Sequence, residues 1–267
     1  MADPLDQVTP LLLTCNEEAN IGRTLAGLSW ARRVVVIDSG SSDRTLQILA
    51  GFPRVEVHTR PFDSHARQWN HGLEQIRGGW VLSLDADYQI TPALRREMAA
   101  ALKGALPEVG GFRIPFRYYV AGRPLRGTVL PPRIALFRQA AGHYIDDGHT
   151  QDLVLQGQCG TLREPILHDD RKPLHRWLEA QRRYLPLEVQ KLRATPRDQL
   201  SRADRLRQRH VIAPFAVLLL CLLWHRGLLD GWRGWYYAFQ RMLVELLLSL
   251  MLWEARCDGA GGDATFP

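Results

Sequence analysis

Two carboxylates stand two residues apart at the end of an apolar stretch. Asp85 and Asp87 follow the run WVLSL at 80–84, which predicts a buried strand. Carboxylates with this spacing, just past the end of a strand, can hold one divalent metal ion, Mg²⁺ or Mn²⁺, and leave positions for diphosphate oxygens. A cation there would neutralise the charge that builds up on a departing nucleotide diphosphate. The alternative is a solvated turn that binds nothing.

A further carboxylate, Asp38, ends the apolar run in VVVIDSGSSD. In that position it can accept hydrogen bonds from the N–H of a base or from a ribose hydroxyl. The small residues at 39–42 would let a nucleotide approach the backbone closely. Ser42 or Asp43 could instead cap the helix that follows, and both roles can hold at the same time.

The segments around these acids alternate between strand and helix patterns. Strands are predicted at 8–15, 33–38, 55–59 and 80–84, and helices at 17–28, 43–50, 65–76 and 91–102. Asn16 is placed to cap the first helix, and Thr91 with Pro92 begins the last. Alternation of this kind predicts an α/β fold, with a mostly parallel sheet and helices on both faces.

Three polar side chains fall at the carboxyl ends of predicted strands. Thr14, Asp38 and Asp85 come from distant parts of the sequence. Ligands of parallel α/β sheets bind at the carboxyl ends of the strands, so these residues are expected to line one crevice. Residues 110–167 carry short aromatic and β-branched pieces broken by Gly and Pro, which favour an antiparallel addition to the sheet.

The charge is concentrated in one region. The chain carries a net charge of +6, and the basic stretch comprises Arg171, Lys172, Arg176, Arg182, Arg183, Lys191, Arg193, Arg197, Arg202, Arg205, Arg207 and Arg209. The pattern of this basic stretch predicts a helix, and the most apolar part of the chain follows it. An anionic membrane surface is therefore the expected partner. No base-stacking aromatics are interleaved, which argues against nucleic acid. A solvated helix face remains the alternative.

Two apolar runs follow, at 211–224 and 235–253. A spanning helix needs about 20 apolar residues, whereas the first run is short and the second contains Arg241 and Glu245. The pattern favours apolar, amphipathic helices that form a hairpin in the membrane interface. A spanning pair, or a soluble pair packed on the core or on a second subunit, stays open. The tail at 258–267 is expected to be disordered.

The four cysteines and the N-terminus bear on the compartment. Cys15, Cys159, Cys221 and Cys257 form no CxxC pair, which suits a reducing compartment. The first residues carry acids and no basic-then-apolar run, so no signal peptide is expected. Together with the interfacial hairpin, this predicts a peripheral or monotopic protein on the cytoplasmic face of the cell membrane.

The motifs as a set resemble a known family. TCNEEANIGRTLAGL, VVVIDSGSSDRT and WNHGLEQIRGGWVLSLDAD look like the nucleotide-sugar domain of family 2 inverting glycosyltransferases, which have the GT-A fold. They cover about residues 9–103. Their order and spacing, and RGLLDGWRGWYYAF near the C-terminus, resemble the branch that contains lipopolysaccharide-core glucosyltransferases.

The resemblance implies roles for individual residues. It implies that the donor, with UDP favoured over GDP, contacts a set comprising Thr14, Asn16, Glu17, Asp38, Ser39, Asn70, Asp85 and Arg171. Within that set, Asn70 would lie near the phosphates. It also implies a divalent metal at Asp85 and Asp87. A histidine often joins the metal in GT-A enzymes, and His168 is the expected one here. Arg171 and Lys172 could meet diphosphate oxygens.

An inverting transferase also needs a general base for the acceptor hydroxyl. The related enzymes place an acid about 60 residues past the DxD motif, where this chain reads HYIDDGHTQDL. Relatives of the lipopolysaccharide type tend to show His-Glu there, but this chain has His149, Thr150 and Gln151. Asp147 and then Asp146 are the favoured bases, followed by Asp152 and His149.

The resulting hypothesis is transfer of a sugar from a nucleotide sugar to a lipid-linked, lipopolysaccharide or exopolysaccharide acceptor. A GT-A catalytic domain is expected at 1–172, and a basic helical region with the hairpin at 173–257. A nucleotidyltransferase is disfavoured because TCNEEAN is acidic where a basic, Gly-rich loop would be needed. A non-catalytic membrane module with a degenerate sugar-nucleotide domain also stays open.

Overall fold

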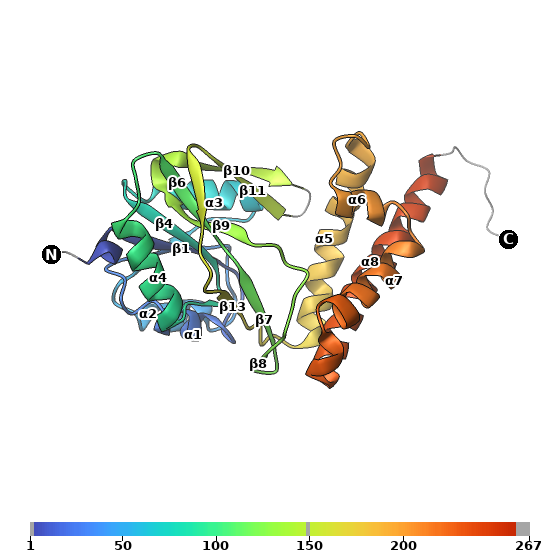
Figure 1. Ribbon diagram of the computed structural model, residues 1–267, viewed down its shortest axis with the longest axis horizontal. Helices are drawn as coiled ribbons and strands as arrows, with labels where there is room; N and C mark the ends of the chain where they lie inside the picture. The colour runs from blue at the N-terminus through green and yellow to red at the C-terminus, as the bar shows by residue number, and fades with distance from the viewer. Residues whose placement is uncertain (1–2, 148–149, 260–267) are drawn as a thin grey trace. The chain divides into compact units, whose positions relative to one another are not determined.

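The computed structural model describes residues 3–147 and 150–259 and divides into two compact units (Figure 1). The first unit holds residues 3–124, 130–146 and 150–172. The second holds residues 125–129, 147 and 173–259 of the described chain. The predicted N-terminal domain, 1–172, differs from the first unit only in the short pieces 125–129 and 147–149.

The first unit is built on a seven-stranded, mostly parallel sheet, as expected. In spatial order its strands are β12 (Gln158–Thr161), β6 (Val109–Ile114), β9 (Arg133–Arg138), β4 (Trp80–Asp85), β1 (Val8–Thr14), β2 (Val34–Asp38) and β3 (Val55–Thr59). Strands β4, β1, β2 and β3 pair in parallel. Only β9 runs against its neighbours, β4 and β6. The antiparallel addition predicted for residues 110–167 is therefore confirmed in this sheet for β9, whereas β12 pairs with β6 in parallel.

Helices cover both faces of the sheet, which explains its continuous apolar runs. Successive strand residues point to opposite faces, so Leu12 packs with helices α1 (Ile21–Ala26), α2 (Thr45–Ala50) and α4 (Pro92–Lys103). Its neighbour Leu11 packs on the other face, against α3 (His65–Glu74). Both leucines are fully buried. A strand buried on both faces has no position for a charged side chain until it ends.

The helix starts differ from the sequence-based expectation in one respect. Asn16 does not cap the first helix, which begins only at Ile21. Its backbone is left-handed, with φ at 57°, and its side-chain oxygen accepts hydrogen bonds from the backbone N–H groups of Ser42 and Asp43. Asn16 therefore joins two loops at the end of the sheet. The Thr91 cap was predicted correctly, since its hydroxyl accepts from the N–H of Leu94 at 3.0 Å.

Smaller elements complete the first unit. A second sheet joins β5 (Tyr88–Gln89), β13 (Ile166–His168), β7 (Phe116–Val120) and β8 (Arg123–Pro124), and a further pair consists of β10 (Gly142–Asp147) and β11 (Thr150–Leu155). Short 3-10 turns lie at Pro4–Gln7 and Gln139–Ala141. The pairing of β13 with β5 sets His168 opposite Tyr88, one residue after Asp87.

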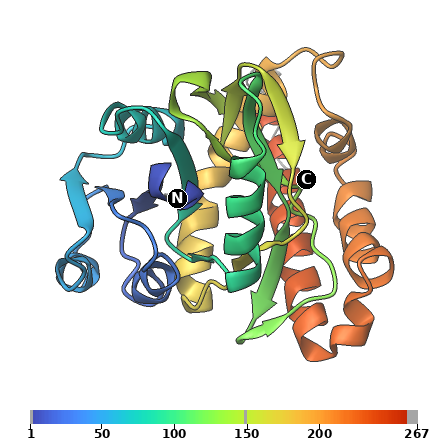
Figure 2. The ribbon, with the colours of Figure 1, turned by 60° about the vertical axis from the view of Figure 1, so that its left-hand side comes forward.

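The second unit is helical. It comprises α5 (Leu174–Ala194), α6 (Arg202–Arg207), α7 (Ile212–Leu219), a π turn at Leu220–Trp224, a 3-10 turn at Gly227–Asp230 and α8 (Trp232–Gly259). Helix α7 lies beside α8 (Figure 2). The unit has its own small core: Leu185, Leu192, Leu200, Leu248 and Leu252. The expected basic helical segment is thus two helices, separated by residues 195–201.

Of the two C-terminal helices, α8 carries charged residues, among them Arg241 and Glu245, whereas α7 carries none. Within residues 3–147 and 150–259, no helix has a stretch long and apolar enough to cross a membrane. The tail expected to be disordered lies outside the described residues from 260 onward.

Close packing of α3 on the sheet yields a stability prediction. A Cβ added at Gly72 would lie 2.5 Å from Cδ1 of the fully buried Leu11. Gly72→Val should lower the free energy of unfolding by about 1–3 kcal/mol, because the core must move to accept it. Gly104→Val is the control, since a Cβ there meets only a backbone oxygen at 3.8 Å. Urea unfolding measures both, and equal midpoints would contradict the packing described here.

Candidate functional site

The carboxyl ends of the parallel strands bring together three of the predicted residues. The pairing of β1 with β2 sets Thr14 opposite Asp38, and the pairing of β1 with β4 sets Leu13 opposite Asp85. The backbone N–H of Ser39 donates to the carbonyl of Thr14 at 2.9 Å. Residues distant in sequence therefore meet at one edge of the sheet, which we call the carboxyl edge.

Asp38 organises the loop that follows β2. Its side chain is fully buried, and one carboxylate oxygen accepts the backbone N–H groups of Gly40 and Ser41, each at 2.9 Å. The other oxygen accepts the Ser41 hydroxyl. The loop returns on itself through Gly40, whose φ of +90° suits a glycine. Asp43, rather than Ser42, accepts the N–H of Thr45 at the start of α2.

Thr14 and Ser39 present hydroxyl groups at the same edge. Thr14 is buried, and its hydroxyl has no hydrogen-bond partner among the described residues. A buried hydroxyl without a partner is costly, so it marks a place where a ligand could supply one. The Ser39 hydroxyl accepts from the side-chain amide of Gln68 at 2.8 Å, which fixes its position.

Glu17 lies in the turn before α1 and holds a cation. Its carboxylate accepts from Nζ of Lys172 at 2.6 Å and from the side-chain amide of Asn20 at 2.9 Å. Burial raises the pKa of Glu17 from its ordinary value of 4.5 to about 7, although Lys172 acts in the opposite direction. Burial alone would lower the pKa of Lys172, but the carboxylates of Glu17 and Asp170 raise it.

Residues 169–172, which follow β13, are tied to α1 by a set of charged contacts. Arg23 donates to the buried carboxylate of Asp169 at 2.8 Å, and Asn20 donates to Asp170 at 2.9 Å. Arg171, predicted to meet the donor, directs its Nε to Asp169 at 3.0 Å and is half exposed. The sequence indicated Arg171, Lys172 and Glu17, but it gave no signal for Asp169 and Asp170.

Asp87 and His168, both predicted metal ligands, are brought together. Nε2 of His168 lies 3.0 Å from an Asp87 carboxylate oxygen. The ring lies between Tyr88 and Tyr118, with centroids 5.0 and 4.5 Å away. Its Nδ1 is buried and has no hydrogen-bond partner in the part of the chain that the structure describes. Burial would raise the pKa of Asp87, but His168 lowers it below its ordinary value.

Asp85 has a different environment. The hydroxyl of Tyr88 is hydrogen-bonded to Asp85, and burial beside this carboxylate raises the pKa of Tyr88. The largely buried guanidinium of Arg133, on β9, is hydrogen-bonded to Tyr88. Sequence reasoning missed Tyr88 and Arg133. Tyr88 could have been found from its place directly after DAD, but the approach of Arg133 depends on β9 pairing beside β4.

The donor set suits a metal that keeps open positions. Within residues 3–147 and 150–259 no three His, Cys, Asp or Glu residues are gathered in an arrangement that could hold a metal ion. Asp87 and His168 offer a carboxylate and an imidazole, and Mg²⁺ or Mn²⁺ often takes only one or two protein ligands, completed by phosphate and water oxygens. The pair fits such an ion.

Asn70 has a structural partner. Its amide N–H₂ donates to the carbonyl of Tyr144 at 2.8 Å, and its oxygen accepts the N–H of the same residue at 2.9 Å. This pair of bonds ties α3 to β10. The contact of Asn70 with donor phosphates stays a prediction.

The expected bases fall on β10 and β11. Asp146 and Asp152 are exposed. Asp147 is grouped with the second unit and pairs with Nζ of Lys191 at 2.6 Å. His149 lies outside the described residues. The choice among these groups stays open.

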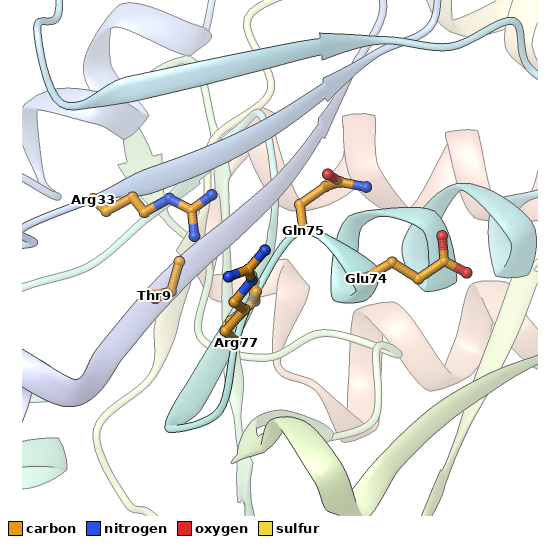
Figure 3. A pocket seen from close by; sticks show the side chains of 6 residues that line it. Thr9, Arg33, Glu74, Gln75 and Arg77 are labelled. Atoms are coloured by element: carbon orange, nitrogen blue, oxygen red, sulfur yellow. The ribbon is translucent and has the colours of Figure 1, made fainter.

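A separate pocket lies at the opposite end of the strands. It has a volume of about 380 Å³ and is lined by Thr9, Arg33, Glu74, Gln75, Ile76 and Arg77 (Figure 3). Thr9 belongs to the start of β1 and Arg33 lies just before β2, while Glu74 ends α3 and residues 75–77 connect α3 to β4. None of the predicted site residues lines it, so it is not the site of the chemistry.

Comparison with known families and proteins agrees with this site. The sequence model described as Glycosyl transferase family 2 matches residues 11–151, more than half of the chain. The chain is 29% identical over 170 residues to the lipopolysaccharide core biosynthesis glycosyltransferase LpsC of Rhizobium meliloti (strain 1021), a match that covers 60% of this chain and 62% of that protein.

Two further likenesses are more distant. The chain is 31% identical over 103 residues to an undecaprenyl-phosphate 4-deoxy-4-formamido-L-arabinose transferase of Pseudomonas paraeruginosa (strain DSM 24068 / PA7), covering 33% of this chain and 30% of that protein. The chain thus spans less than two thirds of either relative. A crystal structure of S. aureus TarS 1–349 with UDP-GlcNAc matches at a TM-score of 0.50 and 16% identity, covering 90% of this chain and 81% of that one. This likeness confirms the expected GT-A fold.

The pKa of Glu17 gives a pH prediction. Its folded-state pKa of about 7 lies above its ordinary 4.5, so the unfolded chain loses the proton first as the pH rises. The free energy of unfolding should therefore fall between pH 4.5 and 7, by about 1–3 kcal/mol, and level off above.

Urea unfolding of wild type and Glu17→Gln across pH 5–8 tests this. Gln does not titrate, so the stability difference between the two should change with pH, while the loss of the Lys172 contact adds only a constant. Glu18→Gln, at a half-exposed neighbour, is the control and should run parallel to wild type. Parallel curves for Glu17→Gln would show that the pKa of Glu17 is not raised.

Proposed function

The chain belongs to glycosyl transferase family 2, and we propose that it moves a sugar, with inversion, from a nucleoside diphosphate sugar to a lipid-linked or lipopolysaccharide acceptor. The observation that carries this proposal is the carboxyl edge, where Thr14, Asp38 and Asp85 meet, with Asp87 and His168 beside Asp85. The donor would bind there, as ligands of parallel α/β sheets do.

The nucleoside would lie over β1 and β2. The unpartnered hydroxyl of Thr14 can bond a polar group of the base or ribose. Asp38 already accepts three hydrogen bonds from its own loop and so holds that loop in shape. A remaining lone pair of its carboxylate can accept a hydrogen bond from the nucleoside. UDP is favoured as the nucleotide, in keeping with the family resemblance and with the UDP-GlcNAc bound to TarS.

The diphosphate would lie between Asp87 and residues 169–172. Asp87 and His168 would hold a divalent cation, which when bound supplies positive charge to the leaving diphosphate. Lys172 and Arg171 add fixed positive charge on the same side. Both are paired with carboxylates in this structure, so they remain in place and ionised without a donor.

The acceptor hydroxyl would lose its proton to a carboxylate as its oxygen attacks the anomeric carbon. The bond from that carbon to the phosphate oxygen breaks, and the nucleoside diphosphate leaves with the electron pair. Asp147 is the favoured base, followed by Asp146. An ion pair with Nζ of Lys191, at 2.6 Å, fixes the position of the Asp147 carboxyl group.

The acceptor is proposed to be carried by a membrane lipid. LpsC, the relative named above, is a lipopolysaccharide core glycosyltransferase. The second unit exposes large apolar side chains along 211–239: Val211, Ile212, Phe215, Leu219, Leu223, Trp224, Leu229, Trp232, Trp235 and Phe239. Trp224 is 80% exposed. An exposed apolar surface of this kind suits the interface of a bilayer, on the cytoplasmic face of the cell membrane.

Donor binding should depend on a metal and on Asp87. UDP- and GDP-sugars, each with Mg²⁺, Mn²⁺ or EDTA, are added to the protein, and the melting temperature and the release of nucleoside diphosphate are measured. One donor should raise the melting temperature only with metal. Asp87→Asn should lose that rise and at least about a hundredfold in turnover, whereas Glu164→Gln, at an exposed acid, should behave as wild type. Full metal-dependent turnover by Asp87→Asn would remove the metal assignment.

Replacing the base should affect turnover but not donor binding. Asp147→Asn should lower kcat about a hundredfold or more and leave the donor-induced rise in melting temperature unchanged. Asp146→Asn and Asp152→Asn, on the neighbouring strands, provide matched comparisons. A large loss in either of those, with Asp147→Asn active, would move the role of base to that residue. If none of the three loses activity, the base lies elsewhere.

A further inference from the structure

A hollow in the second unit is lined mainly by arginine. Arg197, Arg202, Arg205 and Arg209 surround it together with Asp198 and Leu206, and its volume is about 760 Å³. We call this feature the arginine groove. All four arginines are exposed. With one aspartate against four arginines, the lining has a surplus of positive charge.

The groove arginines are without partners, unlike their neighbour Arg207. Among residues 3–147 and 150–259, none of the four guanidinium groups makes an ion pair or a hydrogen bond. Arg207, the last residue of α6, contacts Asp204 at 3.1 Å, Glu188 at 3.5 Å and Glu245 at 3.1 Å. Burial would lower the pKa of Arg207, but these carboxylates raise it.

Helical spacing separates the two kinds of arginine. Arg202 and Arg205 are three residues apart on α6, and Arg209 lies in the turn two residues beyond the end of that helix. Residues three apart on a helix share a face, and like charges there repel each other. The inward face of α6 is therefore neutralised by buried acids, while the outward face carries repulsion that an anion would relieve. Phosphate is the anion best matched to several guanidinium groups.

The surface that follows the groove along the chain is apolar. Val211 and Ile212, directly after Arg209 and the buried His210, are 59% and 53% exposed, and Phe215 on α7 is 53% exposed. A phospholipid has the matching arrangement: its phosphate suits the arginines, and its acyl chains suit the apolar side chains that follow them. A single-stranded nucleic acid would call for stacking aromatics in the groove, and none lines it.

We propose that the arginine groove binds the phosphate groups of anionic phospholipids and so holds the second unit on an anionic bilayer. The proposal rests on the proposed function only in that a lipid-borne acceptor brings the enzyme to a membrane. It adds a site and a lipid selectivity: the apolar residues enter any bilayer, and the groove distinguishes an anionic one.

Vesicle flotation tests the proposal with the full chain. Vesicles of phosphatidylcholine alone are compared with vesicles containing phosphatidylglycerol, at low and high salt. Wild type should bind the anionic vesicles more tightly, and high salt should weaken that binding. Arg202→Gln/Arg205→Gln/Arg209→Gln should lower affinity for the anionic vesicles about a hundredfold, because each surface arginine contributes about a factor of five. Binding to neutral vesicles should not change.

Two further variants separate charge from folding and from net charge. Lys at the same three positions keeps the charge, so Arg202→Lys/Arg205→Lys/Arg209→Lys should retain most of the affinity. Arg77→Gln/Arg96→Gln/Arg163→Gln removes three exposed arginines from the first unit and should bind as wild type. Equal loss in this control would show that net charge alone drives binding, and unchanged binding by the groove triple would overturn the site.

Two other outcomes would show that the groove binds something other than a phospholipid. Stabilisation of the chain by millimolar inorganic phosphate, without preference for anionic vesicles, would make the groove a site for soluble phosphate. Tight binding of a single-stranded RNA that the glutamine triple loses, without vesicle binding, would make it a nucleic-acid site.

Donor-induced stabilisation, measured on the same proteins, keeps the two proposals separate. If the glutamine triple binds donor normally and vesicles as wild type does, only the groove proposal fails. If wild type floats with anionic vesicles but no donor stabilises it, only the transferase proposal fails.

Discussion

Burial of ionised groups at the end of the sheet is the constraint on which the first unit depends. Strands covered on both faces leave no room for charged side chains until they end, so the acids gather at the carboxyl edge. Asp38, Asp87 and Asp169 are all buried there. A buried carboxylate is stable only with hydrogen bonds or a cation. Each of these three has such partners, and each set of partners comes from a different segment of the chain.

The partners explain why the site holds its shape without a ligand. Asp38 binds its own loop, Asp87 binds His168, and Asp169 binds Arg23. The last two contacts join β13 and the residues after it to the N-terminal half of the unit. Segments about 80 and 146 residues apart are thus joined by charge and hydrogen bonding in addition to the apolar packing of Ile166 on β13, and a polar ligand can compete for the charged groups.

Local patterns predicted the elements, whereas tertiary partners could not be read from them. The strands at 8–15, 33–38 and 55–59 were visible because their apolar runs and turn residues are local signals. The shared edge of Thr14 and Asp38 followed from the rule for parallel sheets. By contrast, Arg133 reaches Tyr88 only because β9 inserts beside β4, and Asn16 binds the 42–43 loop because its backbone is left-handed. No periodicity encodes such contacts.

The two units differ in whether their cationic side chains are paired with carboxylates. In the first unit, Lys172 and Arg171 are matched by Glu17 and Asp169, so a diphosphate must displace or share with a carboxylate. Since burial already raises the pKa of Glu17 to about 7, one proton on that carboxyl would free the ammonium group at little cost near neutral pH. In the second unit, the groove arginines pair with no carboxylate of the described residues. At the first site, a phosphate of the ligand therefore replaces a protein carboxylate beside the cation. Such an exchange favours a phosphate held in one defined position. A phosphate that binds in the arginine groove displaces no carboxylate and only neutralises positive charge. The groove therefore suits any surface that carries many phosphate groups.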